Sequence, residues 1–349
     1  MKNPLLTIAL CGLFVSYGFA QTSVLPLKAE LASSEGLVYK LPLTTLVIKA
    51  EATQTVQKPG PFFKYAERFL GTTNVVTEEK TEWHLDNVKV SSRSDADESK
   101  CYHVNINKKT TAYNLSLNDQ GVIEAVNQSV VSRAETSKAC LDVVVSDTTI
   151  KFDLSQLGEE ALVASSIPKM AEMAAKQIYH IRESRANLLS GENEHLPDGT
   201  ALQLMLKYLD KSEQELVALF VGKTITNKQV TQFYVTPKDD MQNHIVFRMS
   251  LLSGIVDAGN LLGRPVYLNV KAYKIANSFL SDSKKAKGLY YNEPGSAEVS
   301  VIDNSKELVR TTCIMPQFGI VKSLPAQLFD EVATQVVFTS LGTIQSISK

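Results

Sequence analysis

The feature that most constrains the fold is a change of period along the chain. In residues 168–221 the apolar positions recur three or four apart, which marks one face of a helix. Gly191 and a polar loop divide this block into two amphipathic halves. Two such helices joined by a short loop pack antiparallel, so the block predicts a helical hairpin. Ser212 and Glu215 have the spacing of a capping box, which favours a break in the second helix near Asp210.

On both sides of the helical block, apolar residues alternate with polar ones. This period of two runs through residues 46–52 and much of 83–126, and it returns in residues 245–249, 266–272 and 297–301. Turn signals separate the runs, which is typical of antiparallel sheets. The sequence therefore predicts an α+β fold, in which two antiparallel β-rich modules, each a sandwich or an open barrel, flank a central helical hairpin.

This pattern divides the chain into five segments. They are a signal peptide (1–20), a linker (21–35), an N-terminal β-rich domain with one short helix (36–164), the helical hairpin (165–222) and a C-terminal β-rich domain (223–349). The short helix is expected after the Pro-Gly-Pro sequence at residues 59–61, and Gly71 ends it.

The first twenty residues have the layout of a targeting segment. Lys2 supplies a positive start, residues 5–19 are apolar, and Gly18 and Ala20 are small residues before a cut at Gln21. Cys11 raises the alternative of a lipid-modified cysteine, but the bulky Leu10 before it favours simple cleavage. We therefore expect an exported chain, in the periplasm, at the outer membrane or at the cell surface, with no transmembrane segment after cleavage.

Three cysteines remain after cleavage, namely Cys101, Cys140 and Cys313. An oxidising compartment allows a disulfide, and the odd number leaves at least one free thiol. A Cys101–Cys140 bridge would stay within one β-rich segment, and three free thiols are the alternative.

A weak internal repeat links the two β-rich parts. The sequence Gly-Leu-Val-Tyr at residues 36–39, followed by Pro42, is similar to Gly-Leu-Tyr-Tyr at 288–291, followed by Pro294. A glycine followed by alternating aliphatic residues also recurs at Gly121, Gly319 and Gly342. Duplication is one interpretation, and the common need of hairpins for a turn glycine is the other.

Composition and motifs exclude several kinds of site. The formal net charge of -1 argues against a nucleic-acid-binding face, which needs an excess of basic residues. No motif for a nucleotide, a metal ion or a catalytic nucleophile fits the sequence, so we expect no cofactor and no metal.

Two groups of residues are candidates for binding. Trp83, Tyr290 and Tyr291 are aromatic residues that could contact a glycan if they are exposed. Arg182, Glu183 and Arg185 lie on the predicted outer side of the first long helix. They are either a partner surface or a solvated face with local ion pairs, which contribute little stability.

Several ordered motifs resemble a family of secreted Bacteroides-type proteins that carry a domain of unknown function. The motifs are residues 36–39, Lys-Pro-Gly-Pro at 58–61 with Tyr-Ala-Glu-Arg at 65–68, Ile-Arg-Glu-Ser-Arg at 181–185, and Gln-Phe-Gly at 317–319. The resemblance implies an exported Gram-negative envelope protein and brings no activity or ligand. It also implies that Thr148, in the Asp-Thr-Thr sequence at 147–149, matches a loose O-glycosylation motif, with a plain strand edge as the alternative.

The leading hypothesis is an exported non-enzymatic cell-envelope protein with a binding or scaffold role. Its partners would be envelope proteins or glycans. Two alternatives come from other functional classes. One is a hydrolase acting on glycans or cell-wall material through distant carboxylates, and the other is a carbohydrate-binding module.

Overall fold

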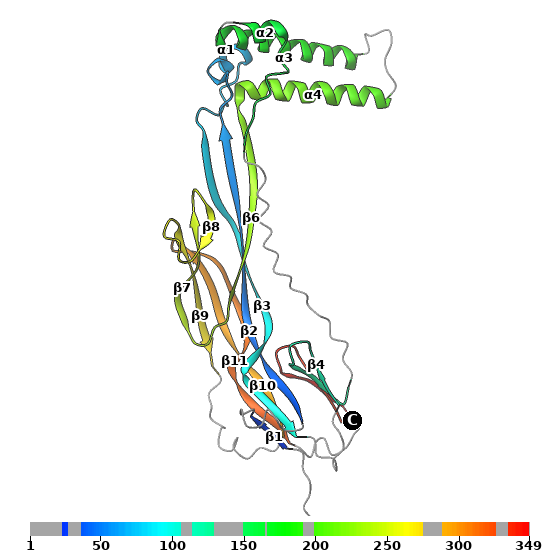
Figure 1. Cartoon of the computed structure of the whole chain (residues 1–349), viewed down its shortest axis with the longest axis vertical. Coiled ribbons are helices and arrows are strands. Elements are labelled where there is room, and N and C mark those ends of the chain that lie inside the picture. The colour runs from blue at the N-terminus through cyan, green and yellow to red at the C-terminus, as the bar shows by residue number, and fades with distance from the viewer. Residues whose placement is uncertain are drawn as a thin grey trace, which may run out of the picture.

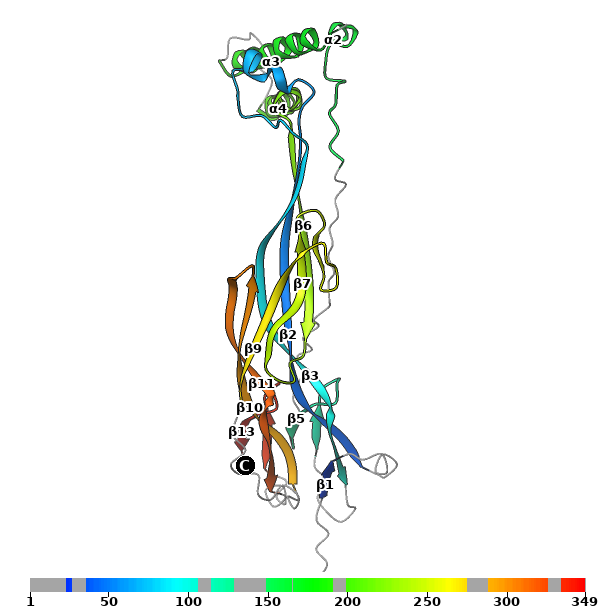
Figure 2. The ribbon, with the colours of Figure 1, turned by 90° about the vertical axis from the view of Figure 1, so that its left-hand side faces the viewer.

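The protein is elongated, with helices at one end and β-sheets along the rest (Figures 1 and 2). The structure is a computed structural model that describes residues 23–26, 36–105, 114–128, 149–164, 166–190, 199–274, 288–325 and 334–348. The helices are η2 (Phe63–Tyr65), α1 (Ala66–Leu70), α2 (Glu159–Val163), α3 (Ile167–Ser190) and α4 (Gly199–Val221). The strands are β1 (Ser23–Pro26), β2 (Leu37–Lys58), β3 (Lys80–Asn105), β4 (Leu115–Leu117), β5 (Ile123–Val126), β6 (Lys223–Val235), β7 (Met241–Ser250), β8 (Gly254–Asp257), β9 (Arg264–Tyr273), β10 (Gly288–Asp303), β11 (Lys306–Pro325), β12 (Gln335–Phe338) and β13 (Ile344–Ser348).

The strands form three antiparallel sheets, and none of them is closed. The orders are β1-β3-β2-β6, β11-β10-β9-β7-β8 and β13-β12-β5-β4. The predicted α+β class and the helical hairpin, α3 with α4, are confirmed. The predicted arrangement of two separate β modules around the hairpin is corrected, because the first and third sheets each combine strands from both sides of it. After α4 the chain returns along β2 as β6, so the helices lie at one end of the molecule.

Three strands form a stalk between the helices and the other sheets. β2 pairs with β3 on one side and with β6 on the other, up to Lys58 and Lys223 at the helical end. Residues 53–58 are only partly buried except for Val56. At the rise of a β-strand these six residues span about 20 Å. Figure 1 shows this ribbon continuing above β8 toward the helices.

Three hydrophobic cores follow one another along the long axis. The first lies between the β2–β3–β6 sheet and the β7–β11 sheet, where Ile48, Phe247 and Val299 are fully buried. The second lies at the base, where the third sheet covers Tyr39 and Tyr102. The third lies among the helices. The two larger sheets are therefore the layers of an elongated sandwich.

A side-chain amide joins the two layers of this sandwich. The Oε1 atom of Gln317 accepts from the backbone N–H of Thr44 at 2.9 Å, and its Nε2 donates to the Thr44 carbonyl oxygen at 2.8 Å. A neighbouring strand would make the same pair of hydrogen bonds. Two residues on, a Cβ at Gly319 would clash with the carbonyl oxygen of Glu293, so the backbone there requires glycine.

The internal repeat in the sequence corresponds to a repeated structural unit. The β2–β3 pair and the β10–β11 pair each contain a β-bulge of the same size. Between two successive register pairs, the first strand advances by two residues and the second by five. The pairs that bracket this bulge are Lys40–Cys101 and Pro42–Ala96 in one hairpin, and Glu293–Ile320 and Gly295–Met315 in the other. Both long hairpins thus carry the same irregularity close to the start of their first strand.

The short hairpins repeat as well. The β4–β5 turn ends in Gly121 (φ 80°) and the β12–β13 turn in Gly342 (φ 77°), both left-handed positions that suit glycine. The carbonyl oxygen of Gly121 accepts from the N–H of Lys40 at 2.9 Å, and that of Gly342 accepts from the N–H of Asn292 at 3.2 Å. Each long hairpin therefore holds its own short hairpin through the same contact.

Candidate functional site

The helices η2 and α1 to α4 form the head of the molecule. The head is fixed to the stalk at the C-terminal end of α4. Phe62 donates its N–H to the carbonyl oxygen of Leu219 at 2.8 Å, and its ring lies 5.5 Å from that of Phe220. A Cβ at Gly60 would clash with the same Leu219 oxygen. Gly222 (φ 89°) then ends α4 so that β6 can begin at once. The head is therefore joined rigidly to the stalk.

Three zones follow one another along α3 and α4. The first is the cluster of buried side chains next to the stalk, which we call the root. Its buried residues come from α1, α2, α3 and α4, together with Phe62 and Leu157, and they are mostly alanine on α3 and large residues on α4. Small side chains facing large ones let the two helices pack closely. Fully buried members of the root are Ala171, Ala174, Ile178, Leu216, Leu219 and Phe220.

The second zone is a layer of ion pairs between the helices. Glu213 on α4 receives Arg182 Nε at 2.6 Å and one N–H of Arg185 at 2.8 Å. Arg185 also donates to Asp210 at 2.7 Å, and this hydrogen bond raises the pKa of its guanidinium. The layer crosses α4 at the place where a break was predicted. That prediction is wrong, because α4 is continuous from Gly199 to Val221.

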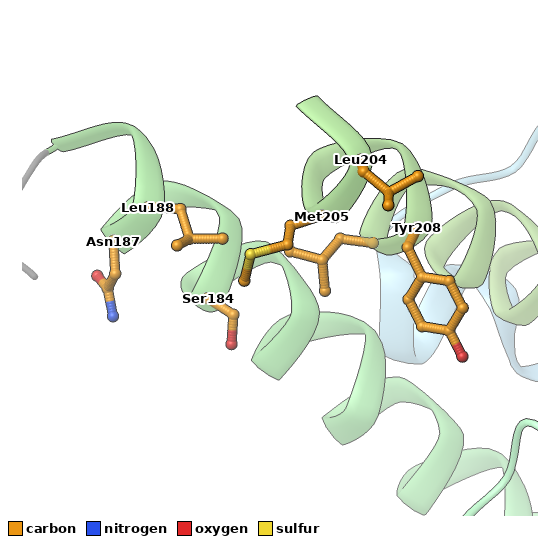
Figure 3. A pocket seen from close by; sticks show the side chains of 7 residues that line it. Ser184, Asn187, Leu188, Leu204, Met205 and Tyr208 are labelled. Carbon is orange, nitrogen blue, oxygen red and sulfur yellow. The ribbon is translucent and has the colours of Figure 1, made fainter. Parts of the chain in front are cut away.

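The third zone is an open apolar groove at the free end of the two helices, with a volume of about 680 Å³. Its lining residues are Ser184, Asn187 and Leu188 from α3 and Leu204, Met205, Tyr208 and Leu209 from α4. Figure 3 shows Leu188 and Met205 projecting from their helices toward one another, with Leu204 and Tyr208 also on α4. None of the lining residues is charged. We call this site the tip groove.

Large side chains at the tip groove are uncovered. Leu204 is 70% exposed and Tyr208 67% exposed, whereas Leu216 and Phe220 on the same helix are fully buried. An exposed cluster of this kind marks a binding surface more often than a structural one. Only Ser184, Asn187 and the Tyr208 hydroxyl offer hydrogen bonds, so the groove suits an uncharged, mostly apolar ligand.

Residues 35–345 match the family described as Domain of unknown function (DUF4831). The chain belongs to this family. No curated protein and no solved structure matches the chain.

The motifs by which this DUF4831 member resembles other chains lie at structural joints. Gly60 contacts α4 where the head meets the stalk, Arg182 and Arg185 join α3 to α4, and Gln317 joins the two sheet layers. These motifs therefore explain the fold of the DUF4831 chain, and of their residues only Ser184 lines the tip groove.

The structure separates the residues that were predicted as a partner surface. Arg182 and Arg185 pair with acidic residues of α4, so they connect the helices, and only Glu183 is fully exposed. A partner surface there stays a prediction.

The three predicted glycan-contacting rings do not share a face. Trp83 is half-buried and packs on the core between the sheet layers, beside Gly254. Tyr290 is buried in the base core, with its ring 4.6 Å from that of Tyr102, and Tyr291 is partly buried there. A flat row of exposed rings is therefore not formed by these residues, and a glycan contact stays a prediction.

Two further predicted sites involve residues outside the described part of the chain. Cys101 lies on β3, with its Sγ 3.3 Å from the carbonyl oxygen of Glu98, but Cys140 is outside the described residues. The Cys101–Cys140 bridge and O-glycosylation of Thr148, which also lies outside them, therefore stay predictions.

Two kinds of feature are absent from the described residues of the DUF4831 chain. They contain no group of three His, Cys, Asp or Glu side chains arranged to hold a metal ion. None of the helices among them has the length and hydropathy that a bilayer crossing requires.

Sequence reasoning did not identify the tip groove. Leu202, Met205 and Leu209 belong to the apolar stripe of the second helix, and such a stripe normally faces the core, but all three are at least partly exposed. A signal was present in Leu204 and Tyr208, which are large residues four positions apart and outside that stripe. Such an off-stripe pair indicates a second apolar face on a helix.

Proposed function

We propose that this protein is an exported, non-enzymatic cell-envelope component whose stalk presents the tip groove to a partner protein. The partner would place an apolar segment, such as the apolar face of a helix, between α3 and α4. The observation that carries this proposal is the uncharged groove at the free end of a rigidly mounted helix pair. An amphipathic helix laid into an apolar groove is a common mode of peptide recognition.

The architecture supports a presenting role. The stalk holds the head away from both sheet layers, and the head is joined to it through backbone contacts at Gly60 and Gly222. A site on a rigid element loses little conformational freedom when it binds. The signal peptide and the resemblance to secreted Bacteroides-type chains support a place in a Gram-negative envelope.

The ion-pair layer marks one end of the proposed binding surface. Arg182, Arg185 and Glu213 satisfy one another directly below the groove, so no unpaired charge has to be covered when a partner binds. The apolar segment that the groove can accept therefore ends at this layer, on the side facing the root.

A photo-crosslinking experiment in the native cell tests this proposal. A benzophenone amino acid in place of Leu204 should give one dominant protein adduct in the envelope fraction. The matched control replaces Gln203, which is exposed on the opposite side of α4 and should give little adduct. Equal adduct patterns at both positions, or turnover of envelope glycans by the purified chain, would contradict the proposed role.

A further inference from the structure

Two turns at one end of the β7–β11 sheet carry four exposed leucines. Leu251 and Leu252 lie in the turn between β7 and β8, and Leu261 and Leu262 lie in the turn between β8 and β9. They are 54%, 78%, 82% and 80% exposed, respectively. Side chains so uncovered must protrude from the surface rather than line a groove. We call these four residues and their turns the leucine turns.

Three backbone groups of the first leucine turn are paired within the protein. The Ser250 hydroxyl oxygen accepts from the N–H of Leu252 at 3.3 Å and of Ser253 at 3.2 Å. The carbonyl oxygen of Leu251 accepts from the N–H of Trp83 at 2.9 Å. This turn is therefore fixed to the stalk, and these three backbone groups do not need water as a hydrogen-bond partner.

The second leucine turn is held from inside by an arginine. Arg248 donates from Nε to the carbonyl oxygen of Ala258 at 2.8 Å and from a terminal nitrogen to that of Gly263 at 3.1 Å. The side chain of Asn260 accepts from the N–H of Leu262 at 3.0 Å. Leu261 and Leu262 are thus displayed on a loop whose shape is set by polar contacts beneath them.

Charge is nearly absent from the leucine turns. Asp257 is the one ionisable residue in residues 250–263. The two flanking arginines have partners, because Arg248 binds the second turn and Arg264 forms a bidentate pair with Asp303 at 2.8 and 2.9 Å. The turns therefore have apolar side chains without accompanying cations, so anionic head groups would find no unpaired cation within residues 248–264.

The turns also stand at the margin of the molecule. Figure 1 shows the turns around β8 protruding on its left-hand side, and Figure 2, which looks onto that side, shows them toward the viewer. A flat surface lying along this flank would meet the turns before it met the helical head.

We propose that the leucine turns insert into the acyl-chain region of a lipid surface. A fluid monolayer accepts convex apolar protrusions without a complementary cavity, and it tolerates inserted backbone only where hydrogen bonds are satisfied internally. The four protruding leucines meet the first condition, and the hydrogen bonds within both turns favour the second. Because both arginines that flank the turns have partners, attachment depends on burial of apolar area more than on lipid charge. The inference does not rest on the tip groove, which lies on the helical head.

Vesicle flotation of the full chain after signal-peptide removal tests the inference. We expect the chain to float with neutral phosphatidylcholine vesicles, with little change between 50 and 500 mM NaCl, a range that would release a charge-driven contact. The Leu252→Gln/Leu262→Gln variant should lower the partition coefficient at least tenfold, because two apolar side chains are no longer buried. The matched control is Leu204→Gln/Tyr208→Gln in the tip groove, which should float as the unchanged chain does.

The single tryptophan supplies a second readout. Trp83 lies directly beneath the first leucine turn, against Gly254. Vesicles that carry brominated acyl chains should therefore quench its fluorescence, and the quenching should disappear in the Leu252→Gln/Leu262→Gln variant.

Several results would overturn the lipid assignment. They are failure of the unchanged chain to float, flotation that the leucine variant does not reduce, binding that requires anionic lipid and disappears in salt, and leucine-dependent dimerisation without lipid. Loss of flotation in the tip-groove control would also overturn it, because the contact would then lie on the head. Failure of the photo-crosslinking at Leu204 leaves this experiment unaffected.

Discussion

The two ends of the α3–α4 pair use the same kinds of residues for opposite purposes. At the root, Phe220 and Leu219 are fully buried against Phe62, whereas at the tip Leu204 and Tyr208 are mostly exposed. A buried large apolar side chain contributes several kcal/mol to stability, and an exposed one contributes little. The root therefore keeps the head folded, and the tip has apolar residues that folding does not require.

We expect the largest loss of folding stability from a substitution in the root. Phe220→Ala should destabilise the chain by about 3–5 kcal/mol, because it leaves a cavity among buried side chains. Urea denaturation followed by the helical circular dichroism signal measures it. A loss below about 1 kcal/mol would show that the root does not hold the head together.

A smaller loss is expected where the root meets the stalk. Gly60→Ala places a Cβ against the carbonyl oxygen of Leu219 and should cost about 1–3 kcal/mol through the backbone shift that it forces. The control is Gly158→Ala, because Gly158 has open space around it and a negative φ. Thermal melts that give the same midpoint for both variants would argue against a rigid joint.

The ion-pair layer should show an intermediate and salt-dependent effect. Glu213→Gln removes the shared acceptor of Arg182 and Arg185, and we expect a loss of about 1 kcal/mol that shrinks in 1 M NaCl. Glu215→Gln is the control, because Glu215 forms its ion pair with the exposed Lys211 of the same helix, at 4.0 Å. Equal losses for the two variants in low salt would show that the layer does not connect the helices.

The smallest stability change is expected at the tip. Leu204→Gln/Tyr208→Gln should alter the free energy of unfolding by less than about 0.5 kcal/mol, because both side chains are already in water. The same denaturation experiment measures it. A loss approaching that of Phe220→Ala would remove the distinction between root and tip.

Local periodicity was sufficient to predict most of the individual elements. The helical hairpin and the short helix ended by Gly71 are both confirmed. Each of these elements is stabilised mainly by neighbours in sequence, so its signal lies in a short window.

The sheet topology could not be predicted in the same way. The pairing of β2 with β6 joins residues on opposite sides of the helices, and an alternating pattern does not reveal which strand is the neighbour. The internal repeat was the exception, because Gly121 and Gly342 occupy equivalent turns and the sequence places a similar segment after each.

The solvent exposure of individual apolar side chains could not be predicted from the sequence either. Leu219 and Leu204 look alike in sequence, but only Leu219 is covered by the other residues of the root. The exposure of the leucine turns was not predicted for the same reason, because a pair of leucines beside a glycine is also typical of a buried strand end. Which apolar residues are covered depends on tertiary contacts.

The most direct test of the central claim measures stability and partner contact in the same variant. A benzophenone amino acid in place of Asn187, on the α3 side of the groove, should crosslink a single envelope protein in cells. Adding Leu204→Gln/Tyr208→Gln should abolish that adduct while the unfolding free energy stays unchanged. An adduct of undiminished yield in the polar-tip variant would contradict the assignment of the tip groove as the binding site.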